Sequence, residues 1–139
     1  MFDSTVCLKS LNAHRALCDK ILHLVEKESV LLRSENPAEA TDLRTERKNL
    51  LAELDVSLDK IREIRIGWLK LEPVQRHGHP EIAELLRENQ NLIMKILVLD
   101  RENEQTLLRH GLVPPRHVPS ANRQRPHFVA NMYQRNAAG

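Results

Sequence analysis

The sequence is poor in glycine and aromatic residues. Among 139 residues it has 4 glycines, and aromatic side chains make up only 3%. Hydrophobic residues account for 41% and charged residues for 29%, with Leu, Glu, Arg and Ala prominent. This composition favours long helices over a turn-rich fold, and the length fits a single domain.

Long apolar runs are also missing. The longest candidate is interrupted by Lys95, so no stretch reaches the roughly 18 apolar residues that a membrane span needs. The first residues, Met1 to Ser4, lack a basic segment followed by an apolar one, so no secretory signal is expected. These features predict a cytoplasmic protein without membrane insertion.

Only two cysteines are present, Cys7 and Cys18. On one helix their α-carbons would lie roughly 16 Å apart, far beyond the limit of about 7 Å for a disulfide. No histidine or carboxylate accompanies them at metal-binding spacing, so they are predicted to be small buried side chains.

Acidic residues are absent from the last part of the chain. Residues 112–139 contain Arg116, Arg123, Arg125 and Arg135 and no Asp or Glu, which gives this segment a charge of +4. Because the whole chain carries +2, residues 1–111 carry −2. We therefore expect a helical bundle domain over 1–111 and a flexible basic tail over 112–139.

Apolar residues at alternating three- and four-residue steps predict three long helices. The first runs from about Ser4 to Arg33, and His14 on its apolar face is predicted to be a satisfied core histidine. The second starts at Asn36-Pro37, with Asn as the cap, and ends near Glu72-Pro73. The third starts at Pro80 and ends at His110-Gly111, where the glycine suits a left-handed cap.

The segment between the second and third helices, 72–81, holds one glycine and two prolines, which predict irregular structure. His77 and His79 there supply at most two metal ligands, so a turn is the better interpretation. Connections of this modest length favour antiparallel neighbours, and the expected fold is an all-α antiparallel bundle of three long helices.

A fourteen-residue repeat marks the third helix. Arg87-Glu88-Asn89-Gln90 recurs as Arg101-Glu102-Asn103-Glu104, so Asn89 and Asn103 face the same way. Each buried amide would need hydrogen-bond partners or cost about 1–3 kcal/mol. The asparagines either fix helix register, as in coiled coils, or line a groove where a partner helix supplies contacts.

Nothing in the sequence points to catalysis or to a cofactor. There is no nucleophile motif, no glycine-rich phosphate loop and no helical His/Glu pair at metal spacing, and the seven histidines are scattered. We therefore expect a binding protein rather than an enzyme.

The tail carries a second candidate interaction element. In the segment 127–136, Phe128 and Met132 are four residues apart, as are Val129 and Tyr133, which favours a short recognition helix. This helix would form on a partner's groove or pack back on the bundle. Nucleic-acid binding through the four arginines is a weaker alternative, because the remaining chain is slightly acidic.

Two segments resemble the FlgN-type flagellar export chaperones. Glu46-Arg47-Lys48-Asn49-Leu50-Leu51-Ala52-Glu53-Leu54 is similar to the charged-then-Leu-Leu segment of that family's central helix, and Asn89-Gln90-Asn91-Leu92-Ile93 is similar to the opening of its last long helix. The resemblance covers roughly residues 8–112. It implies a chaperone that holds helical C-terminal segments of late flagellar subunits, such as hook–filament junction proteins, and presents them to the export apparatus.

In such a role, apolar side chains would supply contact area, amides would supply hydrogen bonds, and Tyr133 would take the place of a tail tyrosine. The predicted partner-binding residues are Asn89, Leu92, Ile93, Ile96, Leu97, Asn103, Phe128, Met132 and Tyr133. A generic helical adaptor or coiled-coil structural protein is the main alternative, and the apolar faces also allow pairing with a second copy.

Overall fold

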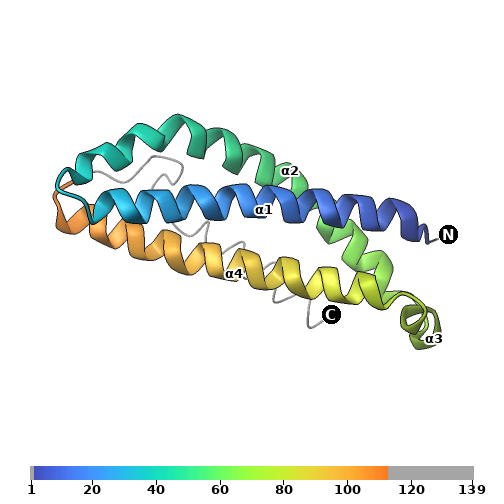
Figure 1. Ribbon diagram of the computed structural model, residues 1–139. Coiled ribbons are helices and arrows are strands. Elements are labelled where there is room, and N and C mark those ends of the chain that lie inside the picture. Colours follow the sequence, from blue (N-terminus) through green and yellow to red (C-terminus); the bar gives the residue numbers. More distant parts are fainter. Residues whose placement is uncertain (1, 113–139) are drawn as a thin grey trace.

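The computed structural model describes residues 2–112 as an all-α bundle of three long helices (Figure 1). The long helices are α1 (Ser4–Leu32), α2 (Arg44–Leu69) and α4 (Pro80–Arg109). A 3₁₀ helix, η1 (Pro37–Leu43), precedes α2, and the short helix α3 (Pro73–His77) precedes α4. The predicted up-down-up arrangement is confirmed. Phe128, Met132 and Tyr133 lie outside the described residues.

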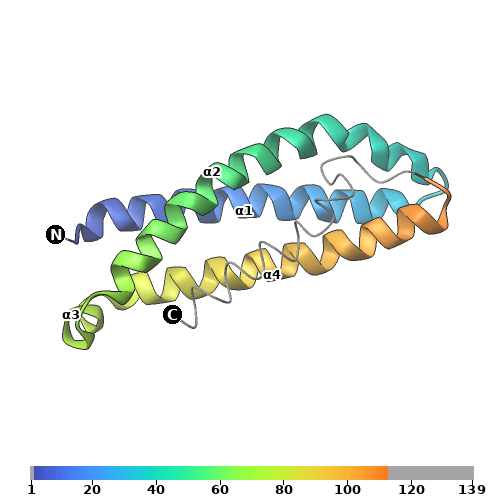
Figure 2. The ribbon, with the colours of Figure 1, turned by 180° about the vertical axis from the view of Figure 1, so that it is seen from behind.

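The long helices are unequally packed. α1 and α4 run in the same direction and lie side by side, whereas α2 runs opposite to both (Figures 1 and 2). α2 packs on α1 but approaches α4 closely at very few positions. The bundle is therefore a parallel pair, α1 and α4, with α2 attached mainly through α1.

Three clusters of buried apolar residues follow one another along the bundle. The central core cluster joins all three long helices and consists of Cys18, Ile21, Leu22, Val25, Leu54, Leu58, Ile93 and Ile96. A second cluster lies at the α3 end around Leu11, Ile61, Trp68 and Ile82. The third joins Leu32, Ala40 and Leu107 at the opposite end.

The start of the second helical segment differs from the prediction. Pro37–Leu43 forms a 3₁₀ helix, and the α-helix begins only at Arg44. The Asn36 side chain does not cap the backbone; its amide donates to Glu39 Oε1 over 3.5 Å. In a 3₁₀ helix, residues three apart lie on one face, and here Ala40 and Leu43 are both buried.

The segment 72–81 is also more regular than predicted. Pro73–His77 forms a helical turn with a proline in its first turn and a capping box between Glu72 and Gln75. The Gln75 Oε1 atom accepts a hydrogen bond from the Glu72 backbone N–H over 3.1 Å. Proline has no backbone N–H, so a first-turn position costs it nothing, and the expectation of irregular structure was wrong here.

Both ends of the α1–α4 pair follow ordinary capping chemistry. Asp3 accepts hydrogen bonds from the Thr5 and Val6 backbone N–H groups over 3.0 and 3.1 Å at the start of α1. After α4, Gly111 has a φ of 72°, and the Leu112 N–H returns to the Leu107 carbonyl over 2.9 Å. The predicted left-handed cap at Gly111 is confirmed. Within residues 2–112, no helix is long and apolar enough to cross a membrane.

Candidate functional site

The two repeated asparagines lie inside the bundle. The Asn89 amide donates to the Leu11 carbonyl over 3.2 Å, and the Asn103 amide donates to the Val25 carbonyl over 2.9 Å. Both pairs span 78 residues, so the same two-heptad step is repeated on α1 and on α4. This is the arrangement of a parallel coiled-coil pair whose register is fixed by polar groups.

Four of the predicted partner-binding residues are therefore core residues of the closed bundle. Asn89 and Ile93 are 0% exposed, Ile96 is 4% exposed and Asn103 is 5% exposed. Direct contact between these side chains and a partner would require α4 to separate from α1. Their role in binding stays a prediction, whereas their role in α1–α4 packing is visible.

Leu92 and Leu97 are half-buried and pack against the central core cluster. At about 100° per residue, they lie on opposite flanks of the buried row of α4. Asp100 lies on the buried row between them and contacts α2 through Arg47. Met94 of α4 and Leu51 of α2 are also half-buried and pack against the same cluster. We call Leu51, Met94 and Leu97 the α2–α4 seam.

A buried ionic cluster joins the three long helices. Arg47 of α2 donates to Glu28 of α1 over 2.6 Å and also pairs with Asp100 of α4. Arg47 is 5% exposed and Glu28 is 3% exposed. With two carboxylates and one guanidinium, the cluster carries one excess negative charge when fully ionised.

Burial raises the pKa of the Glu28 carboxyl to about 7, because desolvation and the nearby Asp100 charge outweigh the attraction of Arg47. The two carboxylates in turn hold the pKa of Arg47 above its ordinary value, despite the desolvation of the guanidinium. Arg47 therefore stays charged, while Glu28 titrates near neutral pH.

Sequence reasoning missed this cluster, although a signal for it exists. Arg47 begins the apolar seven-residue row that continues through Leu54, Ile61 and Trp68, and Asp100 lies midway between Ile93 and Leu107. A charged residue on an otherwise apolar row is expected to find a buried partner. Which charges meet depends on how the helices dock, which no local pattern specifies.

His14, Ser57 and Cys18 form a second buried polar group. His14 Nδ1 lies 2.6 Å from Ser57 Oγ, and His14 Nε2 lies 3.5 Å from Cys18 Sγ. Desolvation lowers the pKa of His14 to about 4 and raises that of Cys18 to about 12. His14 is 0% exposed, whereas Ser57 is half-buried. The prediction of a satisfied core histidine is confirmed, and both cysteines are buried and free.

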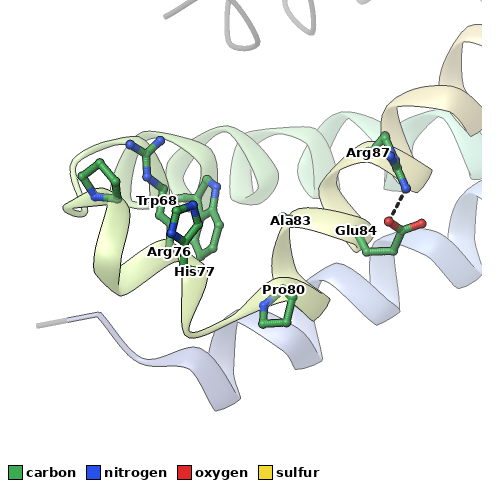
Figure 3. A pocket seen from close by; sticks show the side chains of 8 residues that line it. Trp68, Arg76, His77, Pro80, Ala83, Glu84 and Arg87 are labelled. Carbon is green, nitrogen blue, oxygen red and sulfur yellow. Dashed lines mark hydrogen bonds and ion pairs between the residues drawn. The ribbon is translucent and has the colours of Figure 1, made fainter.

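A cavity lies at the α3 end of the bundle (Figure 3). Its volume is about 760 Å³, and it is lined by Trp68, Pro73, Arg76, His77, Pro80, Ala83, Glu84 and Arg87. Trp68, Arg76 and His77 stand on one side, and the paired Glu84 and Arg87 side chains stand on the other. An apolar wall is thus combined with cationic groups.

A smaller cavity of about 470 Å³ lies between the start of α1 and the end of α2. Phe2, Val6, Ile64 and Leu71 make its lining mainly apolar. Within residues 2–112, no group of three or more His, Cys, Asp or Glu side chains is placed to hold a metal ion.

Comparison with protein-family models, curated proteins and solved structures finds no match to this chain.

Proposed function

We propose that this protein is an export chaperone similar to the FlgN type, which holds an amphipathic C-terminal helix of a late flagellar subunit, such as a hook–filament junction protein. The observation that supports this proposal is the α2–α4 seam. α1 packs along both other long helices, whereas the α2 and α4 backbones approach closely at very few positions. Leu51 of α2 and Met94 and Leu97 of α4 are half-buried against the central core cluster.

A partner helix in this seam would turn three helices into a four-helix bundle. Fully burying one large aliphatic side chain contributes about 1.5–3 kcal/mol, so completing the burial of each half-buried residue contributes roughly 1 kcal/mol. Three such residues give a few kcal/mol before the cost of association. Because association itself costs at least about 4 kcal/mol, the apolar face of the client helix must supply the remaining free energy. Binding through the seam is then expected to be weak and reversible, as a protein that must release its client requires.

Leu92 lies on the opposite flank of α4, so a helix seated between α2 and α4 cannot cover it as well. We therefore assign direct contact to Leu97 and its neighbours. Phe128, Met132 and Tyr133 stay predicted contacts from the tail.

A coiled-coil structural protein or adaptor is the second candidate. The observation that favours it is the parallel α1–α4 pair, whose register is fixed by Asn89 and Asn103. Such a protein has no need for a seam that accepts a foreign helix. Binding of a client helix therefore distinguishes the two functions.

The test uses the full chain and a fluorescently labelled C-terminal segment of a hook–filament junction subunit. We expect the double variant Met94→Ser/Leu97→Ser to weaken binding about tenfold or more, measured by fluorescence anisotropy. Leu92→Ser is the matched control, since it removes a half-buried leucine of the same helix from the other flank. Equal affinity for the double variant and the wild type, or no binding to the wild type, would refute the proposal.

A further inference from the structure

The cavity at the α3 end combines an apolar wall with basic side chains, and its Trp68 also belongs to the second core cluster. Trp68, Pro73 and Pro80 form an apolar surface, while the guanidinium groups of Arg76 and Arg87 and the His77 imidazole lie around it (Figure 3). Glu84 is the only carboxylate in the lining, and it already pairs with Arg87.

Among these groups, Arg76 is the best candidate for binding an external anion. It is partly buried in the cavity lining, and within residues 2–112 no carboxylate forms an ion pair with it. Nearby acidic groups are directed elsewhere, since Glu72 takes part in the capping box of α3 and Glu81 lies 3.8 Å from His79. The guanidinium is therefore available to an external carboxylate.

We propose that this cavity binds an acidic segment of the partner protein, with a carboxylate on Arg76 and an adjacent apolar side chain on Trp68. Arginine is suited to this because its planar fork accepts a carboxylate in a bidentate arrangement. A second carboxylate of the same segment would reach the exposed Arg87 by competing with Glu84. The inference rests on the proposed function only in taking the ligand to be part of a protein.

Charge argues against the chain's own tail as the occupant. Residues 112–139 contain four arginines and no Asp or Glu, so the tail would bring further positive charge to Arg76 and Arg87. An acidic segment brings the complementary charge.

The cavity walls are also held in place. A proline lies in the first turn of α3 and another in the first turn of α4, and the capping box fixes the start of α3. Phe2 packs near both Trp68 and His79, with ring centroids 5.9 Å apart in each pair. A rigid wall lowers the entropic cost of binding.

Trp68 is the only tryptophan of the chain and lines this cavity, so its indole signal is resolved from all others and responds to a ligand bound there. The probe is a short synthetic peptide of alternating glutamate and leucine, and the control peptide carries glutamine in place of glutamate. We expect the acidic peptide to shift the Trp68 indole N–H resonance of the full-length protein, and Arg76→Gln to weaken its binding about tenfold or more. The control peptide should leave the resonance in place.

Arg44→Gln is the matched control variant, because Arg44 is exposed at the start of α2, far along the chain from the cavity. It should bind the acidic peptide as the wild type does. An unshifted Trp68 resonance, or equal weakening by Arg76→Gln and Arg44→Gln, would overturn the inference. Met94→Ser/Leu97→Ser should not alter the Trp68 response, so failure at the seam and failure at this cavity can be told apart.

Discussion

At the scale of single residues, the buried Arg47 is the side chain whose loss should most affect the stability of the bundle. It is the only positive charge among the buried residues of 2–112, and it joins α2 to both members of the parallel pair through Glu28 and Asp100. A buried ion pair contributes little compared with apolar residues of the same size, but breaking one leaves a buried charge without its partner.

We expect Arg47→Met to lower the free energy of unfolding by about 3–5 kcal/mol at neutral pH, because Glu28 and Asp100 would stay buried beside one another. Urea denaturation followed by circular dichroism measures the loss. The triple variant Glu28→Leu/Arg47→Met/Asp100→Leu is the control, and it should recover most of the stability. A loss below about 1 kcal/mol in Arg47→Met would show that the cluster is not sealed from water.

At the scale of helices, the sequence predicted the helix limits that depend on short-range pattern. It did not predict the features that depend on how the helices pack against one another. The limits of α1 and α4 follow from periodicity, Pro80 and Gly111. The periodicity did not show that the segment after Pro37 is 3₁₀ rather than α, because residues three apart, such as the buried Ala40 and Leu43, share a face in either helix.

The candidate site shows the same division. The fourteen-residue repeat of Asn89 and Asn103 was visible in the sequence, and either helix register or a partner groove could explain it. The hydrogen bonds to the Leu11 and Val25 carbonyls on α1 show the part that both amides play in α1–α4 packing, whereas their part in partner binding stays a prediction. The Trp68 cavity was not predicted at all, because it exists only when α3 folds beside the first turns of α4.

Two glycines give opposite predictions for the same substitution. Gly111 has a φ of 72°, so Gly111→Ala should destabilise the protein by about 1 kcal/mol or more. Gly67 lies within α2, and a Cβ there would meet nothing within 4 Å, so Gly67→Ala should stabilise by about 0.5–1 kcal/mol. Thermal and urea denaturation of both variants measure these changes. The same sign for both would contradict the backbone assignment at one position.

At the scale of the whole molecule, two buried groups in different parts of the bundle make opposite contributions to the pH dependence of the unfolding free energy. Glu28 has a raised pKa of about 7, and His14 has a lowered pKa of about 4. The stability linked to Glu28 is present below its ordinary pKa of 4.5 and is lost as the pH rises through 7. The stability linked to His14 is present above 6.5 and is lost as the pH falls through 4.

Between about pH 4.5 and 6.5 the two contributions to the slope of unfolding free energy against pH should nearly cancel. In this range Glu28 binds a proton in the folded state, whereas His14 binds one in the unfolded state. Glu28→Gln removes the falling slope, so its unfolding free energy should rise with pH relative to the wild type, by about 1 kcal/mol per pH unit. The unfolding free energy of His14→Gln should fall with rising pH relative to the wild type, by a similar amount per pH unit. Urea denaturation at several pH values measures the three profiles, and parallel profiles would mean that neither group changes its pKa on folding.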